Sequence, residues 1–246
     1  MSISPPQLAD QKPAPVLYLA SASARRRLLL QEHGVAHVAA APGVDDGELK
    51  PGRVSPEQWV AALAYLKARA GLERLMRGSN RRARSVSEGF PEHGGTPTVE
   101  DDGRWHGVVL GADTVVVKDG EIIGQPRDKE HAGWIVRRLE SGSHDVVSGV
   151  ALLGPGDGER LLLVDRSRVT VGAIGDARIE SYLASEDWRG KAGAYNFSER
   201  IADGWPIACE GDETTVMGLP MRRLTPILTS LGVASSARGA SEATPC

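Results

Sequence analysis

A strand-to-helix corner near the start of the chain constrains its fold more than any other segment. Val16–Ala20 is apolar and predicts a β-strand, and Ala24–His33 predicts a helix that stops at Gly34. The joining residues, 19–26, are Leu-Ala-Ser-Ala-Ser-Ala-Arg-Arg. The corner therefore brings two hydroxyls and two guanidinium groups to the positive end of a helix, where backbone N–H groups lack partners. Such a corner favours an anion, and phosphate is the commonest one.

Strand and helix patterns alternate along the rest of the chain. Further strands are predicted at 35–40, 107–117, 121–123, 144–153 and 161–171, and further helices at 55–76, 128–139, 176–184 and 219–231. Hairpin sequences at 118–120 and 154–158 join two pairs of strands. We therefore expect an α/β fold with a mixed twisted sheet and flanking helices.

Three segments have the composition of chain outside a packed core. A polar, Pro-rich leader at 1–15, an aperiodic insertion at 77–106 and a small, polar tail at 233–246 are expected to be wholly or partly disordered. The folded domain is accordingly predicted to span 16–232.

Composition excludes several classes of protein. The chain has 246 residues, of which 41% are hydrophobic and 25% charged, which is ordinary for a globular domain. The net charge of −3 argues against bulk nucleic-acid binding. Neither a run of 18 apolar residues nor an apolar signal core is present, so we expect a cytoplasmic protein with no membrane partner. Cys209 and Cys246 lack the spacing of a disulfide framework or a zinc site.

Asp113 is the sharpest chemical signal, because it interrupts the apolar run 107–117. A buried carboxylate is costly unless cations, hydrogen bonds or a metal accompany it. Asp113 could be an aspartate at a strand end or bulge, bonded to local N–H groups. The presence of an anion corner and of other carboxylates favours a functional role instead.

Other charged residues are weaker candidates on their own. Asp45 and Asp46 form either a solvated turn or a magnesium site, since Mg²⁺ prefers one or two carboxylates together with phosphate oxygens. Lys67 lies near the apolar face of its predicted helix, and Lys191 lies between glycines that permit close backbone approach. No Walker, dinucleotide-binding, nucleophile-elbow or zinc-protease motif occurs.

Together these pieces resemble the Maf family, the septum-formation-inhibitor-like nucleoside triphosphate pyrophosphatases. The resemblance covers most of 16–231, apart from the insertion. Its motifs, in chain order, are residues 19–26, Asp45-Asp46, 66–70, Gly111-Ala112-Asp113-Thr114, 125–128, 143–146, 190–195 and Gly218-Leu219-Pro220.

The resemblance implies a fold with two lobes around a cleft, like that of inosine triphosphate pyrophosphatases. It also implies hydrolysis of the bond between the α- and β-phosphates of canonical, non-canonical or modified nucleotides. The products are a nucleoside monophosphate and pyrophosphate, and the cofactor is a divalent cation, Mg²⁺ or Mn²⁺. The family often forms homodimers and has been linked to arrest of cell division.

The resemblance also implies residue roles. Asp113 becomes the catalytic aspartate and, with Asp46, a metal ligand. Ser21, Arg25, Arg26, Lys67 and Lys191 line the triphosphate site. Arg26, Thr114 and Ser198 fall at positions that the family uses for substrate selectivity.

The chain departs from the family pattern at three places. Ala24 replaces a proline at a helix start, Gln125 replaces a lysine, and residues 196–200, Asn-Phe-Ser-Glu-Arg, replace the common Gly-Ile-Gln-Gly. Arg127 and Arg200 are candidates for the lost charge. The alternatives to an enzyme of this family are a non-catalytic nucleotide-binding regulator of division, a phosphatase releasing orthophosphate, and a nucleic-acid binder that uses the arginines at 81–84.

Overall fold

The computed structural model describes residues 15–44, 49–82, 107–154 and 159–233, with only the helical backbone at 78–82. Nearly all of the predicted leader and tail, and 83–106 of the predicted insertion, lie outside the described residues. So do Asp45 and Asp46. None of the helices in the described ranges is both long and apolar enough to cross a membrane.

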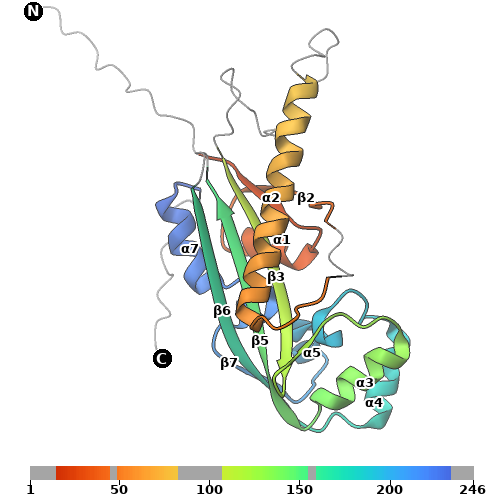
Figure 1. The fold of residues 1–246 in the computed structure, drawn as a ribbon. Helices are drawn as coiled ribbons and strands as arrows, with labels where there is room; N and C mark the ends of the chain where they lie inside the picture. The colour runs from red at the N-terminus through yellow and green to blue at the C-terminus, as the bar shows by residue number, and fades with distance from the viewer. Residues whose placement is uncertain (1–14, 45–48, 83–106, 155–158, 234–246) are drawn as a thin grey trace, which may run out of the picture.

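A mixed sheet forms the centre of the fold, as the sequence predicts, and it has seven strands (Figure 1). The strand order is β2-β1-β3-β5-β6-β7. β4 pairs with the C-terminal end of β3, from Val116 to Lys118. β1 pairs in parallel with β2 and β3, whereas all other pairs are antiparallel. The strands are β1 Leu17–Ala20, β2 His37–Ala40, β3 Val108–Lys118, β4 Glu121–Ile123, β5 Gly142–Leu153, β6 Arg160–Val171 and β7 Ile207–Glu210.

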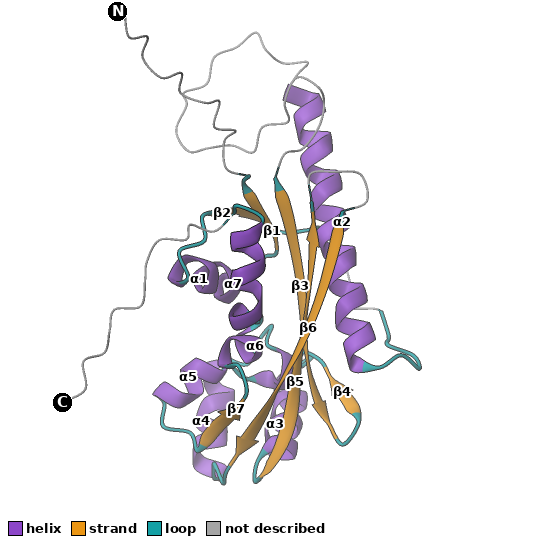
Figure 2. Ribbon diagram, turned by 90° about the vertical axis from the view of Figure 1, so that its left-hand side faces the viewer, coloured by secondary structure: helices purple, strands orange, loops and turns teal. Residues whose placement is uncertain are grey.

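Helices cover both faces of the sheet. α2 lies along one face, and α1 and α7 lie on the other, while α3, α4 and α5 gather at the far end of the long strands (Figure 2). This arrangement gives two lobes that share β3, β5 and β6. The helices are α1 Ala24–Glu32, α2 Pro56–Arg82, α3 Lys129–Leu139, α4 Asp176–Ser185, α5 Phe197–Ala202, α6 Glu213–Met217 and α7 Met221–Ser230, with a short 3₁₀ helix, η1, at Ala192–Ala194.

The period-two pattern of the strands explains how the sheet buries both faces. On β1, Leu17 and Leu19 pack in the core beneath α1 and α7, whereas Tyr18 and Ala20 pack beneath α2. A separate core joins the far ends of β3, β5 and β6 to α3 and α4 around Trp188. Each lobe therefore has its own apolar centre.

α2 approaches the sheet unusually closely, because two strand residues beneath it are glycines. A Cβ built on Gly111 would lie 2.2 Å from the Ala64 carbonyl oxygen, and one on Gly149 would lie 2.6 Å from that of Val60. The close approach fixes the depth at which α2 presents its side chains to β3.

Several elements differ from the sequence-based prediction. α2 continues to Arg82, about six residues past the predicted end, so the start of the predicted insertion is helical. α3 ends at Leu139, as predicted, and β5 begins at Gly142, two residues before the predicted start of that strand. The short elements α5, β7 and α6 were not predicted, because, unlike the equally short β1 and β4, they are not marked by an apolar run or a hairpin turn.

Candidate active site

The candidate site lies where β3 changes its pairing partner. β3 pairs with β1 as far as Gly111 and with β4 from Val116 onward. Residues 112–115 therefore lie between the two partners, beside the end of β1 and the start of α1. Asp113 and Thr114 are the polar residues of this stretch.

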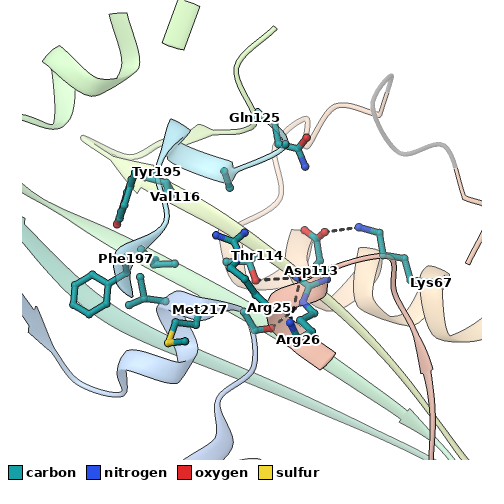
Figure 3. Close-up of a pocket in the computed structure, with 16 residues that line it drawn as sticks. Arg25, Arg26, Lys67, Asp113, Thr114, Val116, Gln125, Tyr195, Phe197 and Met217 are labelled. Carbon is teal, nitrogen blue, oxygen red and sulfur yellow. Dashed lines mark hydrogen bonds and ion pairs between the residues drawn. The ribbon is translucent and has the colours of Figure 1, made fainter. Parts of the chain in front are cut away.

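Consecutive residues of β3 point to opposite faces of the sheet, so Asp113 and Thr114 meet different helices. Asp113 faces α2, where Lys67 Nζ donates to its Oδ1 at 2.7 Å (Figure 3). The Lys67 side chain is 15% exposed and that of Asp113 is 11% exposed. A carboxylate this buried requires a counter-charge, and Lys67 supplies one.

Thr114 faces α1, where Arg26 binds it. Arg26 donates to Thr114 Oγ1 at 3.1 Å, to the Ala112 carbonyl at 2.8 Å and to the Gly218 carbonyl at 3.1 Å. Thr114 Oγ1 in turn lies 2.8 Å from Ser148 Oγ on β5. The guanidinium thus ties α1, β3 and the turn before α7 together, which makes it a rigid wall of the site.

The predicted strand-to-helix corner forms between β1 and α1. Ser23 is the N-cap of α1 and accepts from the Arg26 N–H at 3.4 Å. Ser21 Oγ accepts from the Ser23 N–H at 3.1 Å and from Arg26 Nη1 at 3.4 Å. Both serines therefore shape the corner through local hydrogen bonds.

Two adjoining cavities open on this corner. The smaller, of about 130 Å³, holds Asp113, Lys67 and Thr114 beside an apolar end. That apolar end comprises Val116, Val146, Phe197, Val216 and Met217. The larger, of about 620 Å³, is lined by the α1 corner and by Lys191 and Glu199. Both include Arg25, Arg26, Lys67 and Gln125, so they form one cleft. Its apolar chamber is the apolar end of the smaller cavity, and its cationic chamber is the larger cavity.

The cationic chamber has its own ion pair. Lys191 Nζ donates to Glu199 Oε2 at 2.5 Å, and Asn196 Nδ2 donates to Glu199 Oε1 at 2.5 Å. Burial lowers the pKa of Arg25, whereas the nearby Glu199 carboxylate raises it. Arg25 stays charged in either case, because guanidinium does not deprotonate in proteins.

A family model described as "Maf-like protein" matches residues 16–231. The chain belongs to this family. The Maf chain is 35% identical over 216 residues to the dTTP/UTP pyrophosphatase of Symbiobacterium thermophilum, covering 88% of this chain and 94% of the relative. It is 36% identical to the protein of the same name from Salinibacter ruber (85% and 87% covered) and 37% identical to that from Alkalilimnicola ehrlichii (84% and 88% covered).

Most residues that the Maf resemblance assigns to the site meet in this cleft. Arg25, Arg26, Lys67, Asp113 and Thr114 line the smaller cavity, and Ser21 and Lys191 line the larger one. Ser198 lines neither cavity: its hydroxyl donates to Asn196 Oδ1 at 3.1 Å. Whether these residues bind substrate stays a prediction.

The two arginines suggested as substitutes for the lost lysine do not line either cavity. Arg200 is buried, with its guanidinium 4.2 Å from the ring centre of Tyr182 and 2.9 Å from Asp203. It therefore has a packing role in this Maf domain. Gln125 itself does line the cleft, in the place of the lysine.

Sequence reasoning missed the apolar chamber and the pairing of Glu199. Phe197 and Met217 come from short helices with no periodic signal, so nothing marked them as cleft residues. Glu199 was visible only as part of a departure from the Maf motif. In the described residues, no group of three or more His, Cys, Asp or Glu gathers that could hold a metal ion.

Proposed function

We propose that this Maf protein is a nucleoside triphosphate pyrophosphatase that cleaves between the α- and β-phosphates of dTTP, UTP or a close analogue. The observation that carries the proposal is a single buried carboxylate, Asp113, beside a cationic chamber in one cleft. The relatives named dTTP/UTP pyrophosphatase support the same chemistry.

The two chambers suit the two halves of such a substrate. The base packs in the apolar chamber between Val116, Phe197 and Met217, where burying a ring is favourable. The triphosphate lies in the other chamber against Arg25, Lys67 and Lys191. Arg26 and Thr114 stand at the junction and align the sugar and α-phosphate, because their own hydrogen bonds hold them rigid.

Asp113 is proposed as the general base. Its carboxylate accepts a proton from a water whose oxygen attacks the α-phosphorus, while the bond from that phosphorus to the bridging oxygen breaks. Pyrophosphate leaves with the electron pair of that bond, and the nucleoside monophosphate remains. Lys67 orients Asp113 through its hydrogen bond to Oδ1, and a positioned base contributes roughly 10²–10⁴-fold to the rate.

A divalent cation, Mg²⁺ or Mn²⁺, is proposed as cofactor. The donor set suits it: Mg²⁺ is commonly held by one or two carboxylates and by substrate phosphates, and Asp113 is the carboxylate that lines the smaller cavity. Asp46 is proposed as the second ligand. When bound, the cation neutralises phosphate charge and lowers the pKa of a coordinated water.

The test is a substrate panel with Mg²⁺ or Mn²⁺ that measures pyrophosphate and orthophosphate separately. We expect pyrophosphate release, fastest with dTTP and UTP, and a loss of roughly 10²–10⁴-fold in Asp113→Asn with unchanged circular dichroism. Orthophosphate as the product would reject the proposed bond. Nucleotide binding without any product would favour the non-catalytic regulator.

A further inference from the structure

Glu199 is an acidic side chain in the cationic chamber. It is the one acidic side chain among the described residues that line the larger cavity. The cations there are Arg25, Arg26, Lys67, Arg189 and Lys191. A carboxylate in such a chamber repels a polyphosphate, so its presence calls for a physical reason.

Both oxygens of Glu199 are held in position. Oε2 accepts from Lys191 and Oε1 accepts from the Asn196 amide, each at 2.5 Å. Asn196 is buried and accepts a hydrogen bond from Ser198, so the amide is itself fixed. The side chain of Lys191 is 17% exposed and that of Glu199 is 44% exposed. The carboxylate thus reaches Lys191 from the open side of the cleft.

We propose that Glu199 is an internal competitor of polyphosphate for Lys191, a role that rests on the proposed function. An incoming polyphosphate displaces the carboxylate from Lys191 Nζ, and the carboxylate returns when pyrophosphate departs. The pair thereby weakens the binding of ligands with few charges and promotes release of the pyrophosphate product. Glu199 is a selectivity residue that acts through Lys191 and touches no reacting atom.

The test is the affinity of the full chain for inorganic pyrophosphate, measured by calorimetry. Glu199→Gln keeps an oxygen for the Asn196 amide but removes the negative charge from Lys191. We expect this variant to bind pyrophosphate roughly three- to tenfold more tightly. Product inhibition by pyrophosphate should strengthen by the same factor.

Glu121→Gln is the matched control. Glu121 pairs with Arg138 at 2.7 Å, so the substitution removes the same charge from another ion pair, but neither partner lines either cavity. We expect its pyrophosphate affinity to equal that of the wild type. Unequal affinity of this control would reject a role specific to Glu199.

A double substitution separates competition for Lys191 from a general repulsion between the Glu199 carboxylate and pyrophosphate. In Lys191→Ala, the further change Glu199→Gln should give a much smaller gain, because the contested ammonium is gone. The full gain in that background, or equal or weaker binding by Glu199→Gln alone, would overturn the proposal. Because the readout is binding, a wild type that binds pyrophosphate but hydrolyses no triphosphate would reject the proposed function while leaving this test valid.

Discussion

At the scale of single residues, buried polar groups show which side chains must stay neutral and which must stay charged. His144 is 3% exposed on β5, and its Nε2 lies 2.8 Å from the Tyr195 hydroxyl. Its Nδ1 is buried and makes no hydrogen bond to the described residues. Burial, helped by Lys118 and opposed by Asp145, lowers the pKa of His144 to about 4. The imidazole is therefore neutral wherever the fold is intact near neutral pH.

This depressed pKa predicts a loss of stability in acid. Between pH 6.5 and 4 the unfolded chain binds a proton at His144 that the folded chain does not, so the free energy of unfolding falls as pH falls. We expect His144 to account for about 2 kcal/mol of the loss between pH 7.5 and 5. His144→Gln should lose correspondingly less over that interval in urea titrations. Exposed His33→Gln serves as control, and identical pH slopes for wild type and His144→Gln would contradict the assignment.

Residue type alone indicated that Asp113 needs a partner, because it interrupts an apolar run, but cations, hydrogen bonds and a metal all stayed open. The structure shows that Lys67 on α2 is one such partner. Nothing in the residues showed that Ser198 would turn away to bind Asn196. Its orientation depends on the local loop before α5, which has no regular pattern.

At the scale of elements, the site depends on how deeply α2 sits on the sheet. Gly111 lies under Ala64 and Ala68, and a Cβ there would lie 2.4 Å from the Ala68 backbone nitrogen. Lys67 is carried by the same turn of α2. The glycine therefore sets both the packing of the helix and the reach of Lys67 to Asp113.

Gly111→Ala should push α2 away from β3. We expect it to lower the free energy of unfolding by at least about 1–3 kcal/mol, because the added methyl meets backbone atoms that cannot rotate away. The rate of pyrophosphate release should fall as well, since Lys67 moves from Asp113. Gly124→Ala, where the added Cβ meets no atom within 4 Å, is the stability control. An unchanged free energy of unfolding in Gly111→Ala would contradict this prediction, because it would mean that α2 can move away from β3 with no loss of stability.

Elements were predictable where an apolar run, a helical period or a turn marks them, and α5, β7 and α6 have no such mark. β3 and β5 are buried on both faces of the sheet, so each appears in the sequence as a long, nearly continuous apolar run. α6 spans only five residues and depends on distant contacts: Asp212 caps it, while Ser167 on β6 bonds the Asp212 backbone. Such tertiary contacts leave no local pattern.

At the scale of the whole molecule, charge is distributed unevenly. The net charge is −3, yet five cations and two carboxylates line the described cleft. The sequence showed the net charge and the strand-to-helix corner before α1. Only the fold could show that Lys67, Arg26 and Asp113 meet beside β3. A net negative chain does not attract a polyanion at long range, so anion binding here must depend on the local cations.

Local attraction of this kind is screened by salt. We expect the Michaelis constant for dTTP or UTP to rise roughly threefold between about 0.05 and 0.3 M sodium chloride, because the open part of the cationic chamber is within reach of counter-ions. The turnover number should change less, since Asp113 and Lys67 are nearly buried and screened little. Initial rates at each ionic strength, with sucrose as a neutral control, measure both. A Michaelis constant that stays flat while the turnover number falls would place the salt-sensitive charges at the chemical step instead of the binding step.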